Sequence, residues 1–215
     1  MKKIAVVLSG CGFKDGAEIT EAVSTLISLS QHHVEYKVFA PNIEAETLDH
    51  VTGETIENRN VLKESARIAR GDIKDLQELK SGDFDAVVFP GGFGAAKNLC
   101  DFASKGADCK VNLDVERVIN DFYNSQKPIG AWCIAPALVA RVLGSYNIAV
   151  TIGNDKDTAL EIEKTGAQHV ECTVDDYVTD RENKIITSPA YMYDDTPYKV
   201  FTGINKALSE LVEMA

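Results

Sequence analysis

The sequence predicts an α/β domain in which parallel strands alternate with helices. Short apolar segments rich in β-branched and aromatic residues recur along the 215-residue chain, and stretches with helical periodicity separate them. Ala86–Phe89 is continuously apolar and is closed by Pro90-Gly91-Gly92, which is typical of a strand buried on both faces. We therefore expect a mostly parallel sheet with helices on both faces, formed by a single domain over residues 1–215.

The first half of the chain is expected to contribute three strands and two helices. The apolar residues of the first helix recur at three- and four-residue steps: Ile19, Val23, Leu26 and Ile27. This apolar face should lie on the sheet. The segment Asn42–Leu79 has mixed polarity and predicts only one short helix. The expected strands are Lys3–Leu8, Glu35–Phe39 and Ala86–Phe89, and the expected helices are about Ala17–Gln31 and Val61–Ala69.

The second half continues the alternation and ends in a helix. A proline near a helix start is well tolerated, which favours a helix directly after the strand at Ile129–Trp132. Lys3–Leu8, Ala86–Phe89 and Ile129–Trp132 should be central neighbours in the sheet. The other expected elements are helices at Asp114–Ser125, Pro136–Leu143 and Tyr198–Met214, a strand at Val170–Val174, and a hairpin formed by Tyr177–Thr179 and Lys184–Thr187.

Composition excludes several classes of partner. A net charge of -11 with scattered basic residues argues against nucleic acid. The longest apolar runs are strand-sized, so no membrane segment is expected, and the apolar stretch after Lys2-Lys3 is too short for a signal peptide. The five cysteines are odd in number and lack C-x-x-C spacing, which predicts reduced thiols and a cytoplasmic location.

Cys133 is the main candidate for chemistry. It follows the apolar segment Ile129–Trp132, where the pattern predicts a strand that turns directly into a helix, and such an elbow needs small residues two positions to either side. Ala131 and Ala135 meet that need. A thiol at a helix N-terminus is expected to have a lowered pKa. The competing interpretation is a small buried hydrophobic residue, which most free cysteines are.

Two further features accompany the cysteine. The loop Pro90–Asn98 can offer backbone N–H groups to an oxyanion, although an ordinary strand-to-helix turn has the same glycines. Glu18 lies near the carboxyl end of the first strand, where it can act as an acid or base or simply complement the helix dipole. Glu21 is placed on a different helix face and serves as a control. No histidine is predicted to be catalytic, and no metal-ligand spacing appears.

These elements, in this order, resemble the PfpI and class I glutamine amidotransferase-like superfamily. A narrower likeness, to the enhancing-lycopene-biosynthesis family (ElbB or ES1), covers nearly the whole chain. It is carried by ordered blocks such as Ile4–Gly12, Asp15–Ile19, Pro90–Asn98, Cys133–Pro136, Thr151–Gly153 and Thr187–Met192.

The resemblance implies a flavodoxin-like three-layer sandwich, a homodimer, and a weak glyoxalase activity on small dicarbonyls that needs no cofactor. It implies Cys133 as nucleophile and Glu18 as assisting acid or base. One departure from the superfamily pattern is the absence of a histidine from Ile134–Ile152, which removes the general base of amidotransferases and cysteine proteases. The residues expected to bind substrate or an oxyanion are Gly91, Gly92, Phe93, Ile134 and Asn98.

Two functions from different classes remain open at this point. The first is an enzyme that converts glyoxal or methylglyoxal to a 2-hydroxy acid through a hemithioacetal on Cys133. The second is a non-catalytic redox sensor or chaperone-like protein in which the same cysteine is oxidised. The missing histidine favours the second, and the combination of cysteine, glycine loop and glutamate favours the first.

Overall fold

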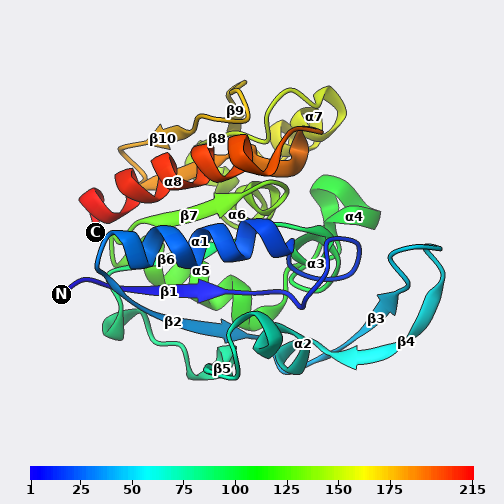
Figure 1. The fold of residues 1–215 in the computed structure, drawn as a ribbon. Coiled ribbons are helices and arrows are strands. Elements are labelled where there is room, and N and C mark those ends of the chain that lie inside the picture. Colours follow the sequence, from blue (N-terminus) through cyan, green and yellow to red (C-terminus); the bar gives the residue numbers. More distant parts are fainter.

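The protein, described over residues 1–215 by a computed structural model, is built on a seven-stranded sheet with the order β10-β11-β7-β6-β1-β2-β5. All neighbouring strands are parallel except the edge pair β10 and β11 (Figure 1). The strands are β1 (Lys3–Val7), β2 (Glu35–Ala40), β5 (Ile73–Asp75), β6 (Ala86–Phe89), β7 (Ile129–Trp132), β10 (Val178–Asp180) and β11 (Ile185–Ser188). The predicted central trio of strands is confirmed as β7-β6-β1.

Helices cover both faces of this sheet, which confirms the predicted three-layer α/β sandwich. One face packs against α1 (Ile19–Gln31) and α8 (Pro197–Met214), and the other against α5 (Leu113–Asn124) and α6 (Ala135–Leu143) (Figure 1). Alternate residues of β1 point to opposite faces of the sheet. Ile4 and Val6 belong to the core under α1 and α8, and Ala5 and Val7 belong to the core under α5 and α6. The central strands are therefore apolar throughout. None of the helices is both long and apolar enough to span a bilayer.

Helix α1 lies where the sequence predicts, but it buries the opposite face. Ile19, Val23 and Ile27 are 47%, 39% and 52% exposed. The buried face is instead largely polar and small-chained: Glu21, Ala22, Ser24, Thr25, Ser28 and Leu29. Small side chains let α1 pack closely against both the sheet and its neighbour on the same face, α8. The expectation that the apolar stripe lies on the sheet is therefore wrong, and the correction brings Glu21 into the interior.

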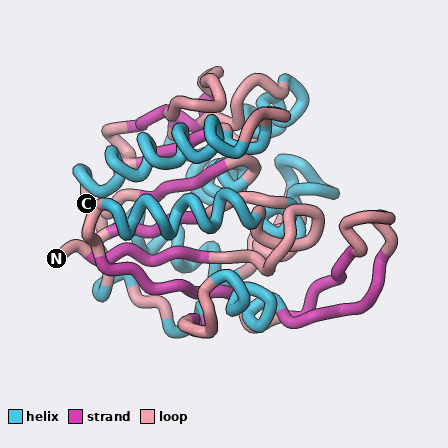
Figure 2. The backbone as a smooth tube through the Cα atoms, in the orientation of Figure 1, coloured by secondary structure: helices cyan, strands magenta, loops and turns pink.

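A two-stranded hairpin in the segment of mixed polarity was not predicted. Strands β3 (Glu44–Leu48) and β4 (Thr55–Asn60) pair antiparallel and project from the body as an arm (Figure 2). Their residues are exposed or half-buried, so they lack the apolar pattern that reveals strands in sequence. The following helix, α2 (Val61–Ile68), is where it was expected.

The predicted strand at Val170–Val174 is also wrong. The structure has β9 (Gln168–His169) paired with β8 (Ala149–Val150), and the segment that follows is irregular. Pairing ends because β8 is only two residues long: the N–H of Val170 still donates to the carbonyl of Val150, but the N–H of Thr151 turns to the hydroxyl of Thr187. The remaining elements are α3 (Phe93–Lys97), α4 (Phe102–Lys105), α7 (Lys156–Lys164) and five short 3-10 turns.

Candidate active site

Cys133 lies on a strained turn between β7 and α6. Its φ angle is 58°, in the left-handed region that non-glycine residues seldom adopt. Ala131 and Ala135 are fully buried on either side, so the expected elbow with small neighbours is present. The backbone N–H of Cys133 donates to the carbonyl of Ser188 at 3.0 Å, which ties the turn to the end of β11. The side chain is thus held in one place with only 7% of the residue exposed.

The carboxyl group beside the sulfur belongs to Glu21. Its side chain is fully buried and shares a hydrogen bond with the thiol of Cys133. Two backbone groups fix the carboxyl: the N–H of Gly91 donates to Oε2 at 2.9 Å, and the N–H of Tyr191 donates to Oε1 at 3.2 Å. Four segments far apart in sequence, around positions 21, 91, 133 and 191, therefore meet at one thiol and one carboxyl group.

The structure does not have the expected contact between Glu18 and the sulfur of Cys133. It is the N-cap of α1, where its Oε2 accepts a hydrogen bond from the N–H of Glu21 at 2.7 Å. Its own N–H donates to the carbonyl of Gly91 at 3.0 Å. A capping residue must turn its side chain back over the first helical turn, and this keeps the carboxylate off the thiol. The contact predicted for Glu18 is made by Glu21, one turn further along.

The electrostatics of the pair are opposite to the expectation for a helix N-terminus. Burial, followed by the nearby charge of Glu21, raises the pKa of Cys133 well above its ordinary value. Burial and the charge of Glu18 raise the pKa of Glu21 to about 8. The backbone N–H groups of Gly92 and Ile134 hydrogen-bond to the sulfur and oppose the shift of Cys133, but burial outweighs them. At neutral pH the site therefore holds a thiol and a largely neutral carboxyl group.

The glycine loop supplies close packing as well as a donor. A Cβ at position 91 would lie 2.5 Å from the Cβ of Cys133, and one at position 92 would lie 2.3 Å from the backbone nitrogen of Glu18. Gly92 also has a φ of 91°. Glycines at both positions let the loop, the elbow and the start of α1 meet, and the N–H of Gly92 then points at the sulfur.

Two other residues of the loop are engaged elsewhere. The N–H of Phe93 donates to the carbonyl of Phe13 at 2.7 Å, so it does not face the sulfur. The side-chain amide of Asn98 donates to the carbonyls of Ser9 and Asp15, each at 2.8 Å. Asn98 therefore fastens the loop between β1 and α1, and its amide does not point toward Cys133.

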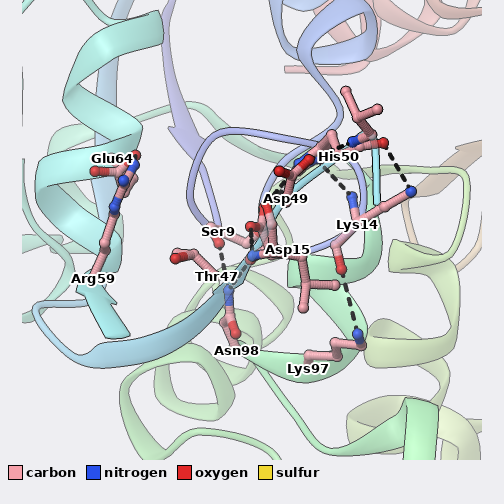
Figure 3. A network of polar contacts seen from close by, with 12 residues as sticks. Ser9, Lys14, Asp15, Thr47, Asp49, His50, Arg59, Glu64, Lys97 and Asn98 are labelled. Carbon is pink, nitrogen blue, oxygen red and sulfur yellow. Dashed lines mark hydrogen bonds and ion pairs between the residues drawn. The ribbon is translucent and has the colours of Figure 1, made fainter. Parts of the chain in front are cut away.

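That loop, residues 9–16, is held by a network of polar contacts (Figure 3). Oδ2 of Asp15 accepts a hydrogen bond from the N–H of Leu48 at 2.7 Å, and Nζ of Lys14 donates to the carbonyl of His50 at 3.0 Å. Nε2 of His50 lies 3.8 Å from Oδ1 of Asp15. The network ties the turn end of the β3–β4 arm, at Leu48 and His50, to the loop that leads into α1, and so helps to position the helix that carries Glu21.

A pocket of about 700 Å³ opens beside the elbow. Phe93, which follows Gly92, and Ile134, which follows Cys133, both line it. Its other walls come from α4 with the turn after it and from α7. The sulfur itself is not part of the lining, so the pocket adjoins the Cys133–Glu21 pair and does not enclose it.

Taken together, the doubly wound sheet, the strained elbow cysteine and the buried carboxyl group define a class of α/β proteins with a thiol–acid site. The chain belongs to the DJ-1/PfpI family, whose model matches residues 2–194. Within that family it resembles the ES1 proteins. It is 43% identical to the mitochondrial ES1 protein homolog of Rattus norvegicus, over 99% of this chain and 84% of that protein.

Two further comparisons agree. The chain is 44% identical to a mitochondrial glutamine amidotransferase-like class 1 domain-containing protein 3 of Homo sapiens, over 99% of this chain and 83% of that protein. The solved structure of an isoprenoid biosynthesis protein with an amidotransferase-like domain from Ehrlichia chaffeensis superposes with a TM-score of 0.94 at 40% identity, covering 100% and 99% of the two chains. The predicted relationship to the ElbB and ES1 proteins is thereby confirmed.

Proposed function

We propose that this chain is a cofactor-independent glyoxalase-type enzyme that converts glyoxal or methylglyoxal to a 2-hydroxy acid. The observation that carries the proposal is the hydrogen bond between the buried carboxyl group of Glu21 and the thiol of Cys133. An acid with a pKa of about 8 exchanges its proton readily near neutral pH, as a proton shuttle must. Membership of the DJ-1/PfpI family is compatible with this chemistry.

The first step is addition of the thiol to the aldehyde. At pH 7 about a tenth of Glu21 is ionised, given its pKa of about 8. This carboxylate takes the proton of Cys133 as the sulfur bonds to the aldehyde carbon, and the proton passes to the aldehyde oxygen. The product is a hemithioacetal. Backbone N–H groups of Gly92 and Ile134, which lie at the sulfur, are suited to stabilise the oxyanion formed on the way.

Isomerisation and hydrolysis follow. Glu21, again ionised, removes the proton from the carbon bonded to sulfur and delivers it to the neighbouring carbonyl carbon. The hydroxyl proton of the hemithioacetal passes to the oxygen of that carbonyl, so the carbon bonded to sulfur becomes the carbonyl and its neighbour carries the hydroxyl. The hemithioacetal is thereby converted to a thioester of the 2-hydroxy acid. Water then attacks the thioester carbon, the carbon–sulfur bond breaks, and Cys133 leaves with a proton. The net change is addition of one water molecule to the dicarbonyl, without a cofactor.

The test is acid production from glyoxal and methylglyoxal after chelation and without added thiols. Cys133→Ser is expected to produce no acid above the uncatalysed rate. Glu21→Gln should lower turnover by at least roughly 10²-fold, because it removes the proton shuttle. Glu18→Gln is the matched control, three residues away on the same helix, and should retain most activity. From the sequence alone, Glu18→Gln would be expected to lose more activity than Glu21→Gln. The geometry leads us to expect the opposite.

The pH dependence gives a second readout. Because the carboxylate form of Glu21 is the base, kcat/KM should rise with pH and level off above its pKa of about 8. A rate independent of pH between 6 and 9, or full turnover in Glu21→Gln, would show that Glu21 is not the base.

A redox-sensing function of the same cysteine is the second candidate. Three hydrogen-bonding groups surround the sulfur, from Glu21, Gly92 and Ile134, and they are suited to stabilise the oxygens of a sulfinic acid. If wild type makes no acid from either substrate, while peroxide converts Cys133 selectively to sulfinate, this candidate is the better one. Cytoplasmic location, a homodimer and a role in isoprenoid biosynthesis stay predictions, and light scattering of the purified protein tests the dimer.

A further inference from the structure

A pair of thiols lies outside the Cys133 site, at the two ends of the segment that forms one wall of the larger pocket. Cys100 is 5% exposed and Cys109 is fully buried. The chain between them forms α4 and a 3-10 turn, Gly106–Asp108, and returns antiparallel to its start. Cys100 forms an isolated β-bridge with Val111, and the N–H of Asp101 donates to the carbonyl of Lys110 at 3.2 Å. This pairing closes residues 100–111 into a narrow strap and brings its two cysteines, nine positions apart in sequence, onto the same side.

The two thiols are neighbours. The ladder at Cys100–Val111 and Asp101–Lys110 places them close together, and a side-chain hydrogen bond between them is the main influence on the pKa of each. The carbonyl oxygen of Ala95, 3.3 Å from Sγ of Cys100, is a competing acceptor for the proton of that thiol. Nε of Arg141 donates to the carbonyl of Cys109 at 2.8 Å, so a guanidinium group stands beside the second thiol. Both cysteines carry free thiols in this structure.

We propose that Cys100 and Cys109 form a reversible disulfide, which makes this strap a redox modification site that responds to hydroperoxides. Cys109 is the attacking residue and Cys100 the resolving one. The site is independent of the proposed function at Cys133.

The ionisation of the two thiols supports these roles. The hydrogen bond from Cys100, followed by the positive charge of Arg141, lowers the pKa of Cys109 in spite of its burial. The same interaction and burial raise the pKa of Cys100 well above its ordinary value. One sulfur is therefore the stronger candidate thiolate, and the other keeps its proton until it is needed.

A surface pocket adjoins the second thiol on the outer side. It has a volume of about 370 Å³ and is lined by Cys109, Lys110, Glu116 and Arg141 among others. A hydroperoxide bound there would meet two positive side chains and one negative one, and it would reach the fully buried sulfur of Cys109 through local opening of the segment. Bulky electrophiles are disfavoured, because neither cysteine is more than 5% exposed.

The chemistry balances with hydrogen peroxide as the oxidant. The Cys109 thiolate attacks one peroxide oxygen, the O–O bond breaks, and hydroxide leaves and takes up a proton. Cys109 is then a sulfenic acid. The sulfur of Cys100 attacks the sulfur of Cys109, the S–O bond breaks, and the leaving hydroxide takes the proton of Cys100 to form water. Two thiols lose two electrons in total, and the peroxide is reduced to two water molecules.

The closed loop would also be a wall of the larger pocket. Phe102, Lys105 and Gly106 of the strap line that pocket together with Ile134. A disulfide between positions 100 and 109 would restrict the conformations open to this wall. It would not contact the Cys133–Glu21 pair. An effect on substrate binding rests on the proposed function, whereas the disulfide itself does not.

Peptide mapping tests the proposal directly. The folded protein is treated with limiting hydrogen peroxide, free thiols are alkylated in denaturant, and trypsin is added without reductant. Trypsin cleaves after Lys97, Lys105 and Lys110, so the two cysteines fall on separate peptides. We expect a linked pair of peptides, 98–105 with 106–110, that separates on reduction. Alkylatable thiols should fall from five to three, since two are consumed.

Two variants sharpen the result. In Cys100→Ser the linked pair should be absent and Cys109 should be oxidised further, to sulfinic acid. Cys172→Ser is the matched control, removes a half-buried thiol elsewhere, and should leave the linked pair unchanged. The proposal is overturned if wild type keeps both thiols alkylatable at peroxide doses that oxidise Cys133, or if Cys109 pairs with another cysteine. Mapping of wild type decides the question even if Cys100→Ser does not fold.

Discussion

Cys133 and Cys109 are both buried thiols, yet their pKa values shift in opposite directions. Cys133 begins the turn into α6, and two backbone N–H groups point at its sulfur, but burial, followed by the carboxyl group that faces it, raises its pKa. Cys109 has no helix N-terminus, and its pKa is lowered by a second thiol and by Arg141. At Cys133, burial and the carboxyl partner outweigh the N–H groups of the helix start, and at Cys109 the side-chain partners outweigh burial. A thiol's place in the fold thus predicts its reactivity poorly until its partners are known.

The largest expected effect is a loss of stability caused by a steric clash at the Cys133 elbow. Gly91→Ala places a Cβ 2.5 Å from the Cβ of Cys133 and 2.6 Å from the carbonyl oxygen of Trp132. Neither neighbour is a flexible chain end, so the elbow must shift. We expect the free energy of unfolding to fall by about 3 kcal/mol or more, measured by denaturant titration.

Gly82→Ala is the control for that substitution. Nothing lies within 4 Å of a Cβ built at position 82, and its φ is not in the left-handed region. The change should stay within about 0.5 kcal/mol. Equal stability of the two variants would mean that the glycine loop does not pack against the elbow as described.

The next effect isolates the charge that distinguishes the two thiols. The pKa of Glu21 is about 8 in the folded protein and near its ordinary value when unfolded, so the folded state binds the proton more tightly. The stability that Glu21 contributes is therefore present below about pH 4.5 and is lost as pH rises toward 8. Glu21→Gln removes this loss. Between pH 5 and 8 the variant should gain on the order of 3 kcal/mol relative to wild type.

The slope with pH is the quantity to measure, because the amide has its own cost. Both oxygens of Glu21 accept backbone N–H groups, and the NH₂ of glutamine cannot accept, so about 1–3 kcal/mol is lost at every pH. The same variant should lower the pKa of Cys133, seen as alkylation at lower pH, since the carboxylate that raises it is gone. Parallel stability curves for the two proteins would contradict the assignment of a raised pKa to Glu21.

The smallest expected effect concerns Cys109 and the influence of Arg141 on its pKa. Arg141→Gln should raise the pKa of Cys109 and slow its reaction with methyl methanethiosulfonate at neutral pH, by less than about tenfold because the hydrogen bond from Cys100 remains. Lys110→Gln removes a positive charge from the adjacent residue and serves as the matched control. A similar slowing in both variants would mean that general surface charge, and not Arg141, sets the reactivity of Cys109.

The parts of the fold that the sequence predicts well are those with a strong hydrophobic pattern. The central strands are apolar on both faces, and the elbow at Cys133 follows from the small residues around it. The hairpin arm was missed because its strands are polar and exposed. The sequence does not point to Glu21, because the apolar stripe of α1 predicts a different buried face. The signal that points to it is a polar face at helical spacing, Glu21, Ser24, Thr25 and Ser28, on a helix that must pack on a sheet.

The contacts between distant segments are what the sequence alone does not provide. Tyr191 lies 170 positions from Glu21 and still donates to its carboxyl group. Cys100 and Cys109 show no recognised spacing, and only the return of the chain after α4 brings them together. Such pairs depend on how loops close, for which periodicity gives no information.

The only tryptophan of the chain immediately precedes Cys133. Trp132 is fully buried, and its indole Nε1 donates to Oγ1 of Thr25 at 3.0 Å, while that hydroxyl donates to the backbone carbonyl of Glu21 at 2.8 Å. The emission of this protein therefore arises from one indole connected to both halves of the thiol–acid pair. Fluorescence can follow an adduct or oxidation at the sulfur in unlabelled wild type, with no background from a second tryptophan.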